Sequence, residues 1–280
     1  MNSTSTGTVQ AVIQADLEYA AVGGTSLRLD LYTPAGATTP LPTLLYLHGG
    51  AWAVGDKSDL AVERLVPLVA QGFAVASANY RLVPTATWPA QIHDVKAAVR
   101  WLRANAAEYG LDPARVAVGG SSAGGHLASM VGLTAGDPAL EGDVGDHDGE
   151  SSAVGAVVAY FPPTDFLLTG SRNPLETQIL PPPPMAALLG VARVADDIEL
   201  ARSASPRHRA HAGASPHLIL HGDHDTMVNH EQSRVLHEAL SAAGASSLYL
   251  LISGAGHEDP AFVRPSVTGA VAGFLSEALG

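Results

Sequence analysis

A serine lies in the middle of a short run of small residues, 120–124 (GSSAG), which reads G-x-S-x-G with Ser122 at its centre. Residues 115–118 (RVAV) precede this run and predict a strand, and residues 126–131 (HLASMV) follow it and predict a helix. A strand, a sharp turn carrying a serine and a helix together make a nucleophile elbow, in which small flanking residues avoid collisions. We therefore predict that Ser122 is a nucleophile towards acyl bonds, held at a helix N-terminus that favours negative charge.

An activated serine also needs hydrogen-bond donors for the oxyanion that forms during its reaction. Residues 48–52 (HGGAW) come directly after the predicted strand 44–47 (LLYL), and their small side chains leave backbone N–H groups uncovered. A Gly-rich loop directly after such a strand is a known donor site, and the N–H of Ala123 would be the second donor. The alternative is a tight turn that needs glycine for its own backbone. We expect His48 to brace this loop rather than to transfer protons.

A carboxylate and a histidine complete such a site, and both are predicted on loops that follow late strands. Asp223 and Asp225 follow the predicted strand 217–220, and we choose Asp225 because it lies at the far end of the loop, close to the next helix. We expect Asp223 to cap or brace the turn. His257 lies on a Gly-rich loop after the predicted strand 248–252, where the chain order Ser, Asp, His places the base.

Other histidines and acidic residues of the chain allow alternative hypotheses. His126 is a second candidate for the base, but it falls inside the helix after the serine, where we expect it to pack. The histidines and aspartates within residues 217–230 are a weak signal for a metal site. The acidic, Gly-rich residues 136–152 offer oxygen ligands to calcium, but their spacing is not that of an EF-hand. We expect a solvated surface loop there, and we expect neither a metal nor a cofactor.

The amino-acid composition limits the classes of protein to which the chain can belong. The chain has 280 residues, of which 46% are hydrophobic and 15% are charged, as in a globular protein with a sizeable core. The net charge of −12 argues against nucleic acid or an anionic membrane surface as a partner. The absence of cysteine excludes disulfides, thiolate metal sites and cysteine nucleophiles. Together with the serine motif, this favours a small-molecule ester as the partner, and homo-oligomerisation is left open.

Short apolar runs alternate with helical patterns, which predicts an α/β fold with a mostly parallel sheet flanked by helices. Ligands of such sheets lie beyond the carboxyl ends of the strands, where the motifs above fall. We predict a single domain over residues 1–280. Residues 165–205, with four prolines at 181–184, break the pattern and are expected to form a cap or lid. The predicted strands are 17–22, 27–32, 44–47, 73–78, 115–118, 154–160, 217–220 and 248–252. The predicted helices are 61–70, 89–108, 126–131, 185–189, one that starts near residue 229, and 261–279.

The location of the protein in the cell is predicted only from the absence of signals. Residues 1–7 (MNSTSTG) contain neither the basic nor the apolar region of a signal peptide. No apolar run reaches the length of a membrane span. A cytoplasmic protein is the expectation, and secretion after removal of a leader is left open.

The motifs together resemble those of α/β-hydrolase carboxylesterases, in particular the hormone-sensitive-lipase-like esterases and the related feruloyl and acetylxylan esterase (BD-FAE-like) group. The likeness spans most of the chain, and the motifs stand in the family's order. It implies a serine esterase in which Ser122 is the nucleophile, Asp225 the orienting acid and His257 the base. The matching stretches are residues 48–52 with 55–57, 79–84, 88–94, 112–116, 119–127, 221–228 and 256–257.

The resemblance also implies that the backbone donors to the oxyanion come from Gly50, Ala51 and Ala123. Ala51 stands where the family's HGGG motif has its third glycine, and because alanine still donates its N–H, the oxyanion hole is expected to survive. The Ala-Trp form points towards carbohydrate esterases and also towards kynurenine formamidases. Trp52 and Trp88 would contact substrate by stacking on sugar or aromatic rings, with buried packing as the alternative.

The reaction that the resemblance implies is hydrolysis of short-chain carboxylic esters through an acyl-serine intermediate, acyl-carbohydrate esters included. A kynurenine-formamidase-like amidase is the alternative among enzymes. A non-catalytic, ligand-binding relative of the same fold is the alternative outside enzymes. Such proteins lose part of the triad, whereas all three residues are present here.

Overall fold

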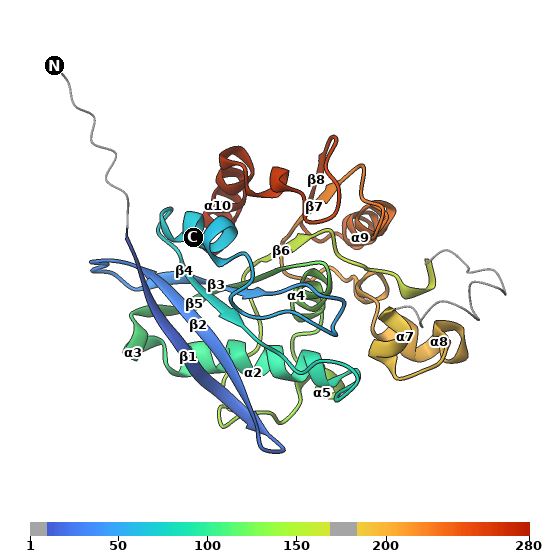
Figure 1. The fold of residues 1–280 in the computed structure, drawn as a ribbon, viewed down its shortest axis with the longest axis horizontal. Coiled ribbons are helices and arrows are strands. Elements are labelled where there is room, and N and C mark those ends of the chain that lie inside the picture. Colours follow the sequence, from blue (N-terminus) through green and yellow to red (C-terminus); the bar gives the residue numbers. More distant parts are fainter. Residues whose placement is uncertain (1–9, 169–183) are drawn as a thin grey trace.

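The computed structural model describes residues 10–168 and 184–280, and within them eight strands form one sheet (Figure 1). The strands are β1 (Ala11–Val22), β2 (Thr25–Pro34), β3 (Leu41–Leu47), β4 (Ala74–Ala78), β5 (Leu111–Ser121), β6 (Val157–Tyr160), β7 (His217–Gly222) and β8 (Ser247–Ile252). Their order is β1-β2-β4-β3-β5-β6-β7-β8. The pairs β1–β2 and β2–β4 are antiparallel, and every later pair is parallel. The predicted α/β fold with a mostly parallel sheet is confirmed.

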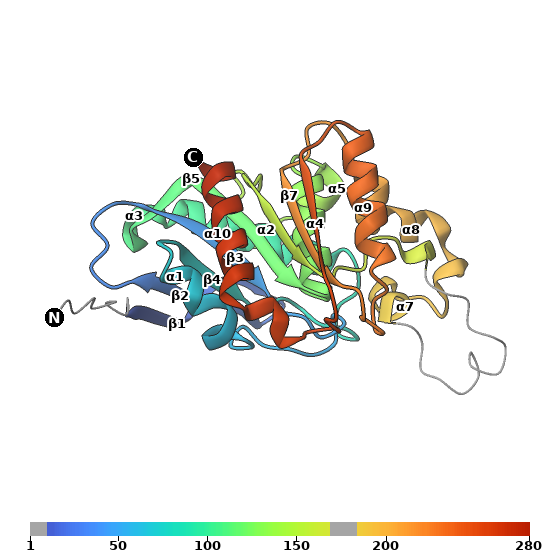
Figure 2. The same ribbon diagram turned by 90° about the horizontal axis from the view of Figure 1, so that it is seen from above.

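Helices cover both faces of this sheet (Figures 1 and 2). They are α1 (Val66–Val69), α2 (Ala90–Ala104), α3 (Ala106–Tyr109), α4 (Ala123–Leu133), α5 (Pro138–Glu141), α7 (Pro184–Leu189), α8 (Ile198–Ser203), α9 (Glu231–Ala242) and α10 (Pro265–Leu279). Shorter turns are η1 (Ala61–Leu65), η2 (Phe166–Leu168), η3 (Val194–Asp196), η4 (Pro206–Arg209) and η5 (Pro260–Val263). In the described part of the chain, no helix is long and apolar enough to cross a membrane.

Alternating strand residues divide the core between the two faces. Leu44 and Tyr46 of β3 pack in one cluster with residues of α1 and α10. Leu45 and Leu47 pack in the other cluster with residues of α2 and α4. This is the period of two that a strand buried on both faces requires. The parallel strands therefore end at one edge of the sheet, and the loops that follow β3, β5, β7 and β8 carry the predicted site.

The predicted elements differ from the observed ones only locally. The predicted helix 89–108 is divided into α2 and α3 at Asn105, whose side-chain amide donates to Trp101 O at 2.9 Å. The backbone N–H of Asn105 donates to the same oxygen at 3.0 Å, and hydrophobic periodicity does not predict the change of backbone conformation at this residue. The predicted helix 61–70 begins as the π-helix η1 and becomes α-helical at Val66.

The predicted cap, residues 165–205, lies partly outside the described residues, because 169–183 are not among them. Its described parts contact the main fold. The ring of Phe166 lies 5.8 Å from that of Trp52, and the N–H of Trp88 donates to Leu188 O at 2.8 Å. Closure of this segment over a site stays a prediction, and so does the single domain over residues 1–280.

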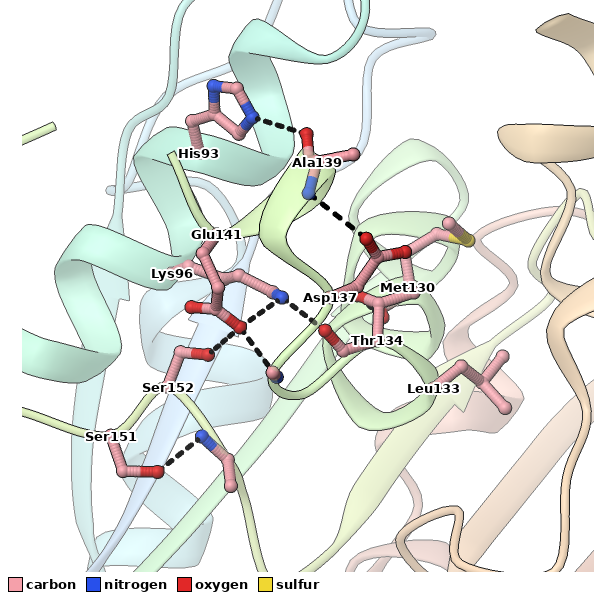
Figure 3. A network of polar contacts seen from close by, with 12 residues as sticks. His93, Lys96, Met130, Leu133, Thr134, Asp137, Ala139, Glu141, Ser151 and Ser152 are labelled. Atoms are coloured by element: carbon pink, nitrogen blue, oxygen red, sulfur yellow. Dashed lines mark hydrogen bonds and ion pairs between the residues drawn. The ribbon is translucent and has the colours of Figure 1, made fainter. Parts of the chain in front are cut away.

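The acidic residues 136–152 take part in a buried polar network (Figure 3). Lys96 on α2 is fully buried, and its Nζ donates to Glu141 Oε1 at 2.7 Å and to Thr134 O at 2.5 Å. The Ser152 hydroxyl donates to the same Glu141 oxygen at 2.9 Å. Glu141 is thus a structural partner of a buried lysine, whereas Asp143, Asp146, Asp148 and Glu150 are exposed, as expected of a solvated surface loop. Among the described residues, no group of three or more His, Asp or Glu side chains is arranged to hold a metal.

His217, at the start of β7, makes the stability of the fold depend on pH. Its side chain is fully buried, with Nδ1 at 2.7 Å from Ser215 O, and burial lowers its pKa from 6.5 to about 4. Between these values the unfolded chain binds a proton that the folded protein does not. The free energy of unfolding therefore falls as the pH drops through this window, by up to roughly 3 kcal/mol.

We expect His217→Asn to reduce this fall, because asparagine does not titrate. Urea denaturation at about pH 7 and about pH 5 measures the difference in unfolding free energy. His224→Asn is the matched control, since that side chain is 74% exposed and should leave the pH dependence unchanged. An unaltered fall in His217→Asn would contradict the prediction.

Candidate active site

Ser122 stands at the turn between β5 and α4, as the G-x-S-x-G pattern predicts. Its φ of 52° and ψ of −114° are strained for a residue with a side chain, and its N–H donates to Tyr160 O at 2.9 Å. The close approach of β3 requires the glycine two residues later, because a Cβ on Gly124 would lie 2.1 Å from Leu47 O. The turn holds Ser122 at the N-terminus of α4, where negative charge is favoured.

The loop that follows β3 lies against this turn. A Cβ built on Gly49 would be 3.6 Å from the Cβ of Ser122. Within the described residues, the N–H groups of Gly50, Ala51 and Ala123 donate to no acceptor of the protein. Free backbone donors therefore lie on the two segments that flank Ser122, which is the arrangement that an oxyanion hole needs.

His48 braces this loop, as expected. Its ring stacks on Tyr80 with centroids 4.4 Å apart, and its Nδ1 lies 2.7 Å from Gly49 O. The Tyr80 hydroxyl donates to His48 O at 2.9 Å. Burial lowers the pKa of His48, which keeps the ring neutral. A neutral, stacked imidazole suits the bracing role that the sequence predicts for His48.

The structure brings together Asp225 and His257, the residues predicted for orientation and proton transfer. His257 Nδ1 lies 2.6 Å from Asp225 Oδ2, and the amides of residues 227 and 228 both donate to Asp225 Oδ1 at 2.9 Å. Asp223 instead accepts from the Gly254 N–H at 2.6 Å and braces the two loops. The geometry thus selects Asp225 over Asp223.

Asp225 is a charged group inside the protein, with a side chain that is 0% exposed. Burial alone would raise the pKa of this carboxyl, but hydrogen bonds from His221, His257 and the Val228 amide hold the pKa well below its usual value. The carboxylate therefore stays ionised at neutral pH. It can accept the Nδ1–H of His257 and leave Nε2 of that ring available for proton transfer.

His221 is a member of the site that sequence reasoning missed. Its Nε2 lies 3.2 Å from Asp225 Oδ2, and its side chain is 0% exposed. The sequence analysis considered this residue only as a weak metal ligand. The available signal was its place at the end of β7, four residues before Asp225, where a side chain can turn back towards the loop.

Two further side chains support the His257 loop and were also missed. Phe161, which follows β6, has a φ of 38° and a fully buried ring 4.6 Å from the ring of His257. Arg64 of η1 is buried beside Tyr160, 4.6 Å from the ring centroid, and reaches Glu258 at 3.5 Å. The ring of His257 and the residue that follows it are therefore held by contacts from other elements.

Ser122 and His257 share no hydrogen bond among the described residues. Such bonds between a serine and its base are often long before a substrate binds, and they tighten in the complex. In the sheet, β6 and β7 lie between β5, which precedes Ser122, and β8, which precedes His257. The end of β6 contacts both sides, because Tyr160 O accepts from the Ser122 N–H at 2.9 Å and the ring of Phe161 lies 4.6 Å from the ring of His257.

Trp52 and Trp88 are core residues. They are 1% and 7% exposed, and both rings contact the ring of His126, which is itself fully buried. This leaves neither indole a free face for a sugar, so the structure favours the packing role over the predicted substrate contact. His126 also packs as expected, with Nε2 at 2.8 Å from Ala204 O.

Comparisons with known proteins agree with this geometry. The BD-FAE family model matches residues 29–240. Esterase LipQ of Mycobacterium tuberculosis is 38% identical over 207 residues, which make up 74% of this chain and 47% of LipQ. The chain spans about half the length of the curated relatives that it matches.

Solved structures extend the likeness over the whole fold. A truncated carbohydrate esterase from gut microbiota has a TM-score of 0.86 at 29% identity and covers 98% of both chains. The esterase Est2 of Thermogutta terrifontis, solved with propionate bound, has a TM-score of 0.75 at 26% identity and covers 98% of this chain and 95% of its own. These neighbours share the α/β-hydrolase fold, and since the family model matches most of the sequence as well, the chain belongs to the BD-FAE family.

Proposed function

We propose that the chain is a serine carboxylesterase that hydrolyses short-chain carboxylic esters through an acyl-serine intermediate. The contact between Asp225 and His257, on loops close to the strained turn of Ser122, carries the proposal. A structural ion pair alone would need neither a strained serine nor free amides on the neighbouring strand ends. The esterase names of the relative and the structural neighbours support the same class of reaction.

In the proposed reaction, the Ser122 hydroxyl attacks the ester carbonyl while His257 Nε2 accepts its proton. Asp225 accepts the Nδ1–H of the same ring and stabilises the imidazolium. The imidazolium then gives its proton to the leaving alcohol, and the acyl-serine remains. A water molecule repeats these steps on the acyl-serine and releases the carboxylic acid. None of these steps uses a metal or a cofactor.

The oxyanion of each tetrahedral intermediate needs donors that are already in place. In the proposal these are the N–H groups of Gly50, Ala51 and Ala123, each of which contributes roughly 3 kcal/mol to the transition state. Backbone donors suit this task because they are fixed by the fold and need no reorganisation when charge develops. The methyl group of Ala51 has no part in it.

The proposed substrates are uncharged esters with short acyl chains, acyl-carbohydrate esters included. Est2 binds propionate, and the gut neighbour is a carbohydrate esterase. Met227 and Val54, on the two loops of the site, have side chains that are 77% and 64% exposed. Apolar groups at these places favour an uncharged substrate, in keeping with the net charge of −12, which repels anions.

Ser122→Ala is expected to lower kcat for p-nitrophenyl acetate by about 10⁴-fold or more without changing the fold, because the nucleophile is lost. Ser121→Ala is the matched control: that side chain is 2% exposed in the same turn and has no proposed role in the reaction. Fluorophosphonate labelling should occur in the wild type and in Ser121→Ala but not in Ser122→Ala. Full activity in a folded Ser122→Ala protein would refute the function.

Ala51→Gly tests whether the donor is the backbone. Because glycine keeps the N–H and tolerates the φ of 54° better than alanine does, we expect kcat/KM to stay within about twofold of the wild-type value. The measurement is steady-state hydrolysis of p-nitrophenyl acetate. A loss of about tenfold or more would show that the methyl group matters, and the assignment of a backbone donor at this position would fail.

A substrate panel tests the acyl preference. We expect kcat/KM to fall from p-nitrophenyl acetate and butyrate to laurate, and to be higher for acetate esters than for N-formylkynurenine. Acetylated xylan tests a carbohydrate as the alcohol, and methyl ferulate tests an aromatic acyl group. Faster turnover of N-formylkynurenine than of every ester would replace the esterase proposal with an amidase.

A further inference from the structure

Two imidazoles meet one oxygen of the buried Asp225 carboxylate. His257 Nδ1 lies 2.6 Å from Oδ2, and His221 Nε2 lies 3.2 Å from the same atom. The other oxygen, Oδ1, accepts from the amides of residues 227 and 228, both at 2.9 Å. The side chains of Asp225 and His221 are both 0% exposed, so water cannot replace a lost partner. The proposed mechanism uses His257 and leaves His221 without a role.

The neighbours of His221 determine where its hydrogen lies. Nε2 faces two acceptors, Val228 O at 2.9 Å and Asp225 Oδ2 at 3.2 Å, so Nε2 must carry the hydrogen. Nδ1 lies 2.6 Å from the hydroxyl oxygen of Ser233 on α9, which is itself fully buried. In the tautomer with its hydrogen on Nε2 alone, Nδ1 is bare and accepts from this hydroxyl. Ser233 thereby stabilises the tautomer that donates to Asp225.

Few charges surround this arrangement. The ring of Phe161 packs against both imidazoles, with centroids 4.6 Å and 6.3 Å away. Among the described residues, Asp225 is the only charged partner of His221 in hydrogen bonds, ion pairs or ring contacts. Glu258, the residue after the base, pairs with Arg64 at 3.5 Å. The charge on Oδ2 is therefore shared between the two imidazoles, while Oδ1 accepts from the two amides.

We propose that His221 is a positioning residue for the reaction, whose neutral Nε2–H fixes the Asp225 carboxylate and takes part of the charge on Oδ2. The inference rests on the proposed esterase function. Without this donor, the carboxylate loses one of its four hydrogen bonds and turns more freely, so His257 is less well oriented. Oδ2 also directs its full charge at His257, which favours the imidazolium form of that base.

His221→Asn and His221→Gln separate this role from packing. Asparagine keeps an amide near the position of Nδ1, towards Ser233, and loses the donor to Asp225. Glutamine reaches the position of Nε2 and keeps an N–H donor there. We expect His221→Asn to lower kcat for p-nitrophenyl acetate about tenfold with KM unchanged. A tenfold loss is the lower end of the effect seen when a residue that orients a metal-binding histidine is removed.

The pH profile of kcat/KM supplies a readout that packing would not move. In His221→Asn its acidic limb should shift to higher pH, and His221→Gln should restore most of the kcat and most of the shift. His217→Asn removes another fully buried imidazole from β7 and is expected to leave kcat and the position of the acidic limb unchanged. Wild-type kinetics in His221→Asn would overturn the proposal. Equal losses in His221→Asn and His221→Gln would overturn it too, because packing alone would then explain them.

Nitrogen-15 NMR of the imidazoles in the full wild-type chain tests the same inference without an assay. We expect a neutral His221 with its hydrogen on Nε2 at neutral pH, and loss of this fixed tautomer in Ser233→Ala. A hydrogen on Nδ1, or an imidazolium, in the wild type would overturn the proposal. This measurement decides the matter even if His221→Asn does not fold.

Failure of the esterase proposal would look different. A wild-type protein that neither hydrolyses esters nor reacts with a fluorophosphonate at Ser122 would refute the function, whatever the His221 variants do. Hydrolysis by the wild type, together with unchanged kinetics in His221→Asn, would refute only the positioning role.

Discussion

The site depends on how closely the backbone of α4 approaches the end of β3. A Cβ at Gly124 would lie 2.1 Å from Leu47 O, so the two elements meet backbone to backbone. This contact sets the N-terminus of α4 beside the loop that carries Gly50 and Ala51, whose amides are free of protein acceptors. The proposed nucleophile and the proposed oxyanion donors are therefore positioned by one and the same contact. A side chain at Gly124 would displace them relative to one another, and catalysis is sensitive to shifts of about 1 Å.

Backbone strain gathers at the same edge of the sheet. Seven non-glycine residues of the described chain have positive φ, and five of them lie on loops of the site: Ala51, Trp52, Ser122, Phe161 and Glu258. Such conformations cost about 1–3 kcal/mol each and persist only where the surroundings determine them. The surroundings here are the parallel strands and the buried rings beneath the loops. The packing of the sheet thus holds the loops in conformations that they would not adopt alone, which is what a site with fixed donors requires.

Sequence predicts those parts of the fold and the site that local chemistry sets. The G-x-S-x-G turn, the HGGA loop and the mostly parallel sheet follow from spacing and periodicity. The contacts of His221 and Phe161 do not, because they join strand ends that lie far apart in the chain. The sequence does not decide whether Trp52 stacks on a substrate or packs in the core, and the tertiary structure shows that it is buried. The division of a predicted helix at Asn105 is likewise absent from the hydrophobic pattern, which continues through this residue. Sequence therefore predicts the proposed reacting groups better than the residues that orient them.

The proposed chemistry and the predicted cap occupy different parts of the chain, yet one contact joins them. Every group in the proposed mechanism comes from a loop at a strand end or from the N-terminus of α4. The described part of residues 165–205 supplies none of them. Phe166, however, packs ring to ring with Trp52 at 5.8 Å and with His126 at 5.1 Å. Trp52 adjoins Ala51, so this aromatic contact joins the described part of the predicted cap to the loop that carries a proposed oxyanion donor.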